Sequence, residues 1–193
     1  MAEQARLLEL QREYSKAAEV MKRALELNPT KRDKAILNYK IGLNLSLAGD
    51  PRSEHFYSQS VRMATENGDT AMACEFLRNY ADYLANNGKY RQSNNVYREI
   101  SRMMPQIAGL SAIQMAMAGN YINLHMPDSA RICNEKAIES EARLEAKGFD
   151  DISRRMVIEL ERCLLDYGDG KPVSYVGLSR YCDSITADMH AKE

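Results

Sequence analysis

Hydrophobic residues recur at every third and fourth position within segments of about 12 to 20 residues. That spacing is typical of one face of an α-helix, and no segment alternates as a β-strand does. Turn-forming residues separate the segments at Asn28-Pro29, Gly49-Asp50, Asn67-Gly68-Asp69, Asn87-Gly88, Pro105, Met126-Pro127-Asp128, Gly148 and Gly168-Asp169-Gly170. The pattern therefore predicts an all-α chain in which antiparallel helices alternate with short turns.

Two series of small residues repeat along the predicted hairpins. The series in the first helices is Ala5, Gly42, Ala81 and Ala118, at intervals of 37, 39 and 37 residues. The series in the second helices is Ala17, Ser53, Ser93 and Ala130, at intervals of 36, 40 and 37 residues. Antiparallel helices approach to about 8–10 Å only where the side chains at their crossing are small. We therefore expect these residues at the helix crossings, with large residues beside them.

The repeat resembles the tetratricopeptide repeat (TPR) family. The third copy matches the family template best, with Leu77, Tyr80, Ala81, Leu84, Gly88, Tyr90, Ser93, Tyr97, Ile100 and Pro105. The first copy ends in ALELNP, and matching it to the template places Met1 at the fourth position of its first helix, so this repeat is expected to be clipped. The resemblance implies a right-handed α-α superhelix, that is, a TPR-like solenoid of antiparallel helix hairpins.

The repeats predict one domain over residues 1–193. Its repeats are expected at about 1–30, 35–68, 71–105 and 111–147, followed by a degenerate terminal hairpin at 150–191. The first helix of that hairpin is predicted to turn Ile152, Met156, Leu160, Cys163, Leu164 and Tyr167 inward. Its second helix is predicted to place Tyr175, Leu178, Tyr181, Cys182 and Ile185 on one side.

Charge and hydropathy argue against two classes of partner. The chain has 26 Lys+Arg against 27 Asp+Glu, a net charge of −1, whereas nucleic-acid binding needs a concentrated positive face. No apolar run approaches the ~20 residues that span a bilayer. We therefore expect no nucleic acid and no membrane insertion by this segment, which reads as soluble and either cytoplasmic or periplasmic.

Candidate chemistry is sparse. Cys74, Cys133, Cys163 and Cys182 form no Cys-x-x-Cys pair, so they are predicted as ordinary buried thiols, although the sequence does not exclude a disulfide. His55, His125 and His190 each lack a second ligand at helical spacing. No catalytic or phosphate-binding motif is present. The sequence predicts no metal, no cofactor and no enzyme activity.

The resemblance supplies the candidate site. In the TPR family the ligand lies along the concave face, lined by first-helix positions away from the packing stripe. Carried onto this chain, those positions are Tyr39, Leu43, Arg78, Asp82, Met115 and Ile122. Their exposed apolar side chains are expected to be covered by a partner peptide, a neighbouring helix of the same chain or a second copy.

Arg78 and Asp82 have two interpretations. They either contact a partner or, because they are four residues apart, pair with each other, and such a pair contributes only ~0.3–0.5 kcal/mol to stability. They then form a solvated helix face, and Asp82→Ala is expected to leave stability nearly unchanged. The carboxylate clamp of some TPR proteins uses Lys and Asn. Here those positions hold Tyr39 with Leu43, Arg78 with Asp82, and Met115 with Gly119. Chaperone-tail binding is therefore disfavoured.

These observations predict a protein–protein interaction scaffold that binds a peptide or protein partner on its concave face. RYCDSI, residues 180–185, resembles the last repeat of bacterial TPR sensors. We therefore expect the chain to be the sensory or partner-binding segment of a larger bacterial signal-transduction protein or transcriptional regulator. The alternative is a structural self-assembly module that forms a homodimer without a peptide ligand.

Overall fold

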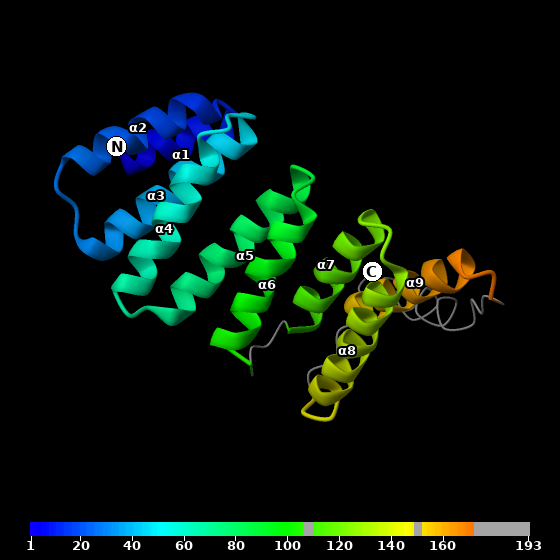
Figure 1. Cartoon of the computed structure of the whole chain (residues 1–193). Coiled ribbons are helices and arrows are strands. Elements are labelled where there is room, and N and C mark those ends of the chain that lie inside the picture. The colour runs from blue at the N-terminus through cyan, green and yellow to red at the C-terminus, as the bar shows by residue number, and fades with distance from the viewer. Residues whose placement is uncertain (106–109, 149–151, 172–193) are drawn as a thin grey trace, which may run out of the picture. The chain divides into compact units, whose positions relative to one another are not determined.

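The computed structural model describes residues 1–105, 110–148 and 152–171, and all regular structure in this part of the chain is helical (Figure 1). The helices are α1 (Ala2–Leu10), α2 (Tyr14–Glu26), α3 (Lys31–Leu47), α4 (Ser53–Glu66), α5 (Thr70–Asn86), α6 (Tyr90–Met103), α7 (Leu110–Asn123), α8 (Pro127–Glu145) and α9 (Ile152–Gly168). The predicted all-α class is confirmed.

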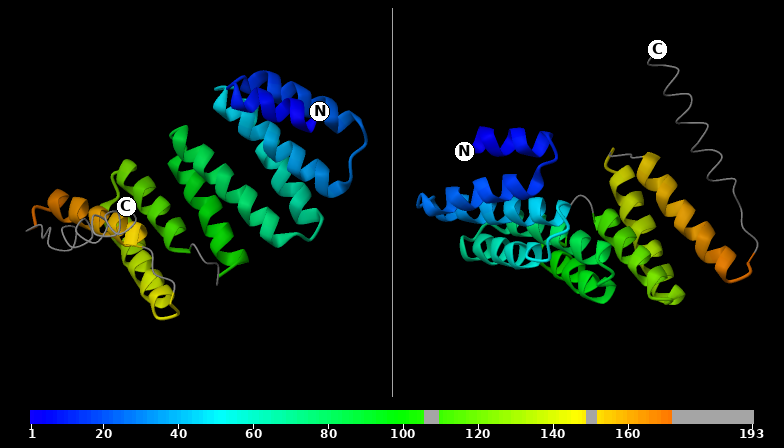
Figure 2. Two further views of the ribbon diagram at one scale, coloured as in Figure 1. Left: turned by 180° about the vertical axis from the view of Figure 1, so that it is seen from behind. Right: turned by 90° about the horizontal axis from the view of Figure 1, so that it is seen from above.

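The chain divides into two compact units. Unit 1, Met1–Met104, contains α1 to α6, and each of these helices packs against the next in the chain. Figure 2 shows the resulting hairpins α1–α2, α3–α4 and α5–α6. Unit 2 begins at Pro105 and contains the hairpin α7–α8, with α9 packed mainly against α8.

The small residues of both predicted series are buried in the helix hairpins. All members of both predicted series are buried: Ala5, Gly42, Ala81, Ala118, Ala17, Ser53, Ser93 and Ala130. At Gly42 a Cβ atom would lie 3.1 Å from the backbone nitrogen of Tyr57 and 3.3 Å from the backbone oxygen of Ser53. Glycine therefore lets α3 approach α4 more closely than any larger residue would, as the interval pattern predicted.

One turn geometry joins the two helices of each hairpin. Arg12, Gly49, Gly88 and His125 all have left-handed backbone angles, with φ between 56° and 73°. Gly49 donates its N–H to Ser46 and the next residue donates to Leu45, which is the hydrogen-bond pattern of a Schellman helix end. His125 makes the same pair of bonds, to Ile122 and, through Met126, to Tyr121. The fourth turn thus keeps the geometry although it lacks the glycine.

The orientation of α9 differs from the prediction. Cys163 is buried as expected, but Leu160, Leu164 and Tyr167 are exposed, Tyr167 at 75%. Ile158 and Leu165 point inward instead. The sequence of α9 carries two apolar stripes, and the one that packs on α8 is the stripe through Ile158 and Leu165. The second helix predicted for this hairpin, with Tyr175 to Ile185, lies outside the described residues.

Candidate protein-binding surface

Four of the six predicted site residues lie in unit 1 on the first helices α3 and α5. Tyr39 on α3 places its ring flat against Phe76 on α5, with 4.5 Å between the centroids and an interplanar angle of 9°. The ring is half-buried and also lies 6.2 Å from the ring of Tyr57. Helix α5 of the same chain therefore covers much of this side chain. A neighbouring helix was one of the three alternatives that the sequence left open, beside a partner peptide and a second copy.

Leu43, one turn after Tyr39, is likewise half-buried. It packs against the buried cluster of Tyr57, Tyr83 and Leu84. The cluster is mostly aromatic, and the rings of Tyr57 and Tyr83 lie 5.4 Å apart. Tyr39 and Leu43 therefore form the partly exposed edge of an aromatic core that joins the second and third hairpins.

Charged residues of α5 surround the hydroxyl group of Tyr39. Burial raises the pKa of Tyr39, the nearby Glu75 and Asp82 carboxylates raise it further, and the Arg78 guanidinium lowers it. These influences show that the three charges lie close to the same hydroxyl group. Tyr39, Arg78 and Asp82 thus lie near one another in unit 1.

Asp82 does not pair with Arg78. Its Oδ1 accepts a hydrogen bond from the hydroxyl group of Tyr97 on α6, and Tyr97 is only 2% exposed. Burial and the Asp82 carboxylate together raise the pKa of Tyr97 far above its usual value. Because Asp82 accepts this bond from a buried tyrosine, we predict that Asp82→Ala lowers stability, in place of the nearly unchanged stability expected from the sequence.

Arg78 is left without a partner in the described part of the chain, where it makes no ion pair within 4.0 Å and no hydrogen bond. Its side chain is exposed. An exposed guanidinium of this kind suits a planar carboxylate, to which it can donate two parallel hydrogen bonds. The local surface thus combines an apolar edge with an available cation.

The other two predicted residues lie in unit 2. Met115 on α7 is half-buried, whereas Ile122 near the end of α7 is 38% exposed. Ile122 lines a cavity of about 350 Å³ whose wall also contains His125, Met126, Pro127, Leu164, Leu165, Gly168 and Asp169. This cavity is mainly apolar and lies between the α7–α8 turn and the end of α9.

A larger cavity of about 410 Å³ lies in unit 1 between α1, α2 and α3, and sequence reasoning missed it. Its apolar wall includes Val20, Met21 and Leu37, and charged side chains at its edge include Arg6 and Lys40. Arg6 is 37 residues before Leu43, one repeat interval, so the repeat register was the signal that could have identified it.

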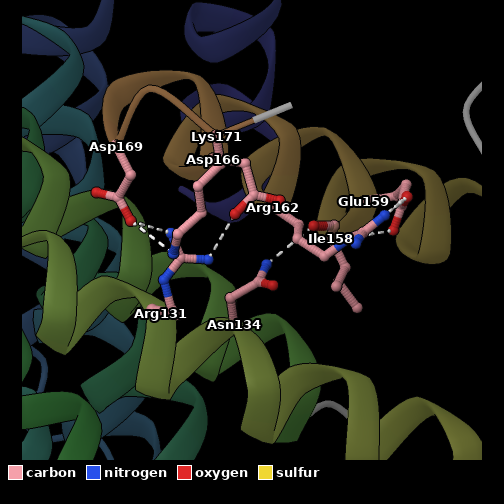
Figure 3. Close-up of polar contacts among 8 residues, drawn as sticks. All are labelled: Arg131, Asn134, Ile158, Glu159, Arg162, Asp166, Asp169 and Lys171. Atoms are coloured by element: carbon pink, nitrogen blue, oxygen red, sulfur yellow. Dashed lines mark hydrogen bonds and ion pairs between the residues drawn. The ribbon is translucent and has the colours of Figure 1, made fainter. Parts of the chain in front are cut away.

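Polar contacts fix α9 on α8 in unit 2 (Figure 3). Arg131 on α8 donates to Asp166 at 2.8 Å and to Asp169 at 2.7 Å. Asn134, also on α8, donates to the backbone carbonyl of Ile158 at 2.9 Å. Asn134 occupies the position where the TPR template has an aromatic residue. The departure from the template is therefore explained by this contact with the α9 backbone.

Metal chemistry and membrane insertion find no support in the described residues. Nowhere in residues 1–105, 110–148 and 152–171 do three His, Cys, Asp or Glu side chains gather around a common point. In the same ranges no helix is both long and apolar enough to cross a membrane. Cys74, Cys133 and Cys163 are buried, and burial raises the pKa of the Cys74 and Cys163 thiols.

The hairpin geometry defines the fold as that of TPR-like helical repeat proteins. No protein-family model matches the chain. No curated protein matches it. Among solved structures, a putative kinesin light chain from Podosopora anserina with nearly identical TPR-like repeats is similar, with a TM-score of 0.73 and 12% identity over 97% of this chain and 93% of that one.

A second solved structure is similar to the same extent. BtubC (BKLC) from P. vanneervenii has a TM-score of 0.73 and 16% identity, over 97% of this chain and 78% of that one. Because both identities are low, these likenesses establish the fold alone. They confirm the TPR-like, all-α solenoid class predicted from the repeats.

Proposed function

We propose that the chain is a protein-interaction scaffold whose binding surface in unit 1 is centred on Tyr39, Leu43, Arg78 and Asp82. TPR-like folds generally mediate protein–protein interaction or assembly. The observation that carries the proposal is the free Arg78 guanidinium beside the partly exposed ring of Tyr39. In unit 2, Met115 and Ile122 are proposed as further contacts.

The chemistry of this surface defines the partner. Tyr39 and Leu43 offer an apolar edge that is already ordered by its own core, so a partner side chain can pack there at low entropic cost. Arg78 offers a charge-assisted hydrogen bond to a carboxylate. The best ligand is therefore a peptide segment that carries a bulky apolar residue next to an acidic residue.

Selection from a phage-displayed library of random peptides on the full chain tests the proposal. We expect selected peptides to combine an acidic residue with a neighbouring aromatic or aliphatic residue. Arg78→Glu should weaken their binding about tenfold or more, because it replaces attraction with repulsion. Arg91→Glu is the matched control, since Arg91 on α6 is also exposed and makes no ion pair or side-chain hydrogen bond within the described residues.

The two variants separate the proposed surface from general charge effects. Equal loss of peptide binding in Arg78→Glu and Arg91→Glu would show that only net charge matters. Unchanged binding in Arg78→Glu would remove this surface as the binding site. Circular dichroism of both variants confirms that the helices are intact.

The narrower function, as the sensory or partner-binding segment of a larger bacterial regulatory protein, stays a prediction. It depends on residues 180–185, which lie outside the described residues. The identity of the sequences that flank this segment in its gene is the observation that tests it. A histidine kinase or helix-turn-helix module encoded next to it would support the prediction, and the absence of both would contradict it.

A second candidate, homodimerisation, is favoured by one face of α9. Val157, Leu160, Leu164 and Tyr167 are exposed at intervals of three, four and three residues, which is the spacing of a helix-pairing seam. Light scattering should then give a dimer mass that Leu164→Lys reduces to the monomer mass. Leu27→Lys, at an exposed leucine of unit 1, should leave the mass unchanged. A monomeric parent protein would end this candidate.

A further inference from the structure

Glu161 occupies an interior position of the contact between α8 and α9. Ile158, three residues before it, and Leu165, four residues after it, are buried on the face of α9 that packs on α8. Helical spacing places Glu161 between them on that face. Its Oε2 lies 3.5 Å from the amide nitrogen of Asn134, which is itself buried on α8. An apolar side chain is the usual occupant of such a position.

The other acidic residues at this contact have cationic partners. Asp166 and Asp169 are held by Arg131, Glu145 lies 3.0 Å from Arg155, and Glu159 accepts from Arg162 at 2.9 Å. Glu141, only 4% exposed, lies 3.0 Å from Arg154 and accepts from Ser111 on α7. Every one of these carboxylates therefore lies beside a cationic side chain.

Glu161 has no such partner among the described residues. Its only polar contact there is with Asn134, whose amide nitrogen already makes the shorter bond, 2.9 Å, to the carbonyl of Ile158. The charged groups that face this contact are Arg131, Glu141 and Glu145 on α8, and Arg154, Arg155, Glu159, Arg162 and Asp166 on α9, and each is engaged as described above. Ionised Glu161 is therefore a half-buried charge without compensation.

The titration of Glu161 is displaced accordingly. Burial raises its pKa from 4.5 to about 7, and the Asn134 contact opposes this shift only in part. Because the folded-state pKa is raised, the contribution of neutral Glu161 to stability is fully present below about pH 4.5. It is lost progressively as the pH rises toward 7, where the folded-state carboxyl ionises.

We propose that Glu161 makes the docking of α9 on α8 pH-sensitive: α9 is held firmly while the carboxyl is neutral and is held less firmly once it is ionised. The effect develops between about pH 4.5 and pH 7, the ordinary and the raised pKa of the carboxyl. Weaker docking exposes Ile158 and Leu165, and it uncovers the α8 surface around Asn134. Unit 2 would then offer more apolar surface above neutral pH than in mild acid.

Hydrogen–deuterium exchange of the full chain at about pH 5.5 and about pH 8, corrected for the intrinsic pH dependence of exchange, tests the proposal. Protection of α9, measured relative to α3, should fall about tenfold between these values in the parent protein, as the displaced pKa requires. Glu161→Gln keeps the shape of the side chain but cannot ionise, so the protection of α9 relative to α3 should stay nearly constant between the two pH values. Glu159→Gln is the control and should retain the fall, since Glu159 is paired with Arg162.

Two outcomes would overturn the proposal. One is a parent protein in which the relative protection of α9 does not change with pH. The other is a Glu161→Gln variant with the same pH dependence as the parent. NMR titration of the Glu161 carboxyl, assigned by its absence in Glu161→Gln, gives an independent readout and should show a midpoint near 7 rather than near 4.5.

Discussion

The hydroxyl group of Tyr97 on α6 donates a hydrogen bond to the carboxylate of Asp82 on α5. The bond joins a residue of the buried core to a residue of the proposed binding surface. A substitution at Asp82 therefore changes stability as well as surface charge. Binding experiments at this position need a stability measurement beside them.

Asp82→Ala should lower the free energy of unfolding by about 1–2 kcal/mol, because the Tyr97 hydroxyl loses its charged acceptor. Urea denaturation measures the change. Combining Asp82→Ala with Tyr97→Phe in a double-mutant cycle isolates the bond. If the effects of the two substitutions simply add, the hydrogen bond contributes nothing and the prediction is wrong.

Gly42→Ala should destabilise the protein by about 1 kcal/mol, because the added methyl group meets the α4 backbone and the helices must separate. Gly119→Ala is the matched control within α7, where a Cβ atom meets nothing within 4 Å. The control should stabilise the protein by about 0.5–1 kcal/mol through helix propensity. Thermal unfolding compares the two. Equal shifts would mean that Gly42 does not mark a helix crossing.

His125→Gly should stabilise the protein by about 0.5 kcal/mol, because glycine adopts the left-handed backbone of this turn without steric cost. The reverse substitution in the equivalent turn, Gly88→Ala, should destabilise it by about 1 kcal/mol. Denaturant midpoints measure both changes. A loss of stability in His125→Gly would show that the imidazole makes a contribution larger than the backbone strain.

Arg131→Met should loosen the C-terminal end of α9 and lower the free energy of unfolding by about 1–2 kcal/mol, because Asp166 and Asp169 lose their shared cation. Hydrogen exchange should show the largest loss of protection in the last turn of α9. Arg143→Met removes a pair in which both side chains are more than half exposed, so its effect should stay within about 0.5 kcal/mol. Similar losses in both variants would contradict a specific role for Arg131.

The repeat register was predictable because it depends on local and nearest-neighbour geometry. Two helices that cross closely require small residues where they touch, so the positions of Ala81 and Ser93 in the sequence indicate the packing. The Tyr39, Arg78 and Asp82 positions followed from the same register. Both turns were predicted, but only Gly88 indicated a left-handed backbone in sequence, whereas the left-handed backbone of His125 is a property of the folded turn.

Hydrogen-bond partners and helix rotation were decided by tertiary packing. Asp82 had a partner four residues away in sequence, yet the structure gives it Tyr97, because α6 brings that hydroxyl group closer than the flexible Arg78 side chain. In α9, the stripe through Leu164 is continuously apolar in sequence, whereas the stripe through Ile158, which is the buried one, includes Glu161. Only the surface of α8, with Asn134 and Arg131 on it, selects the face that is buried.

The amino-acid sequence alone thus determined the helices, their turns and the places where they touch, since these depend on side-chain size and backbone preference within one repeat. The tertiary structure alone decided which charges pair between helices, since such a charge takes its partner from the neighbouring helix. Arg78 is left available and Glu161 uncompensated for that reason.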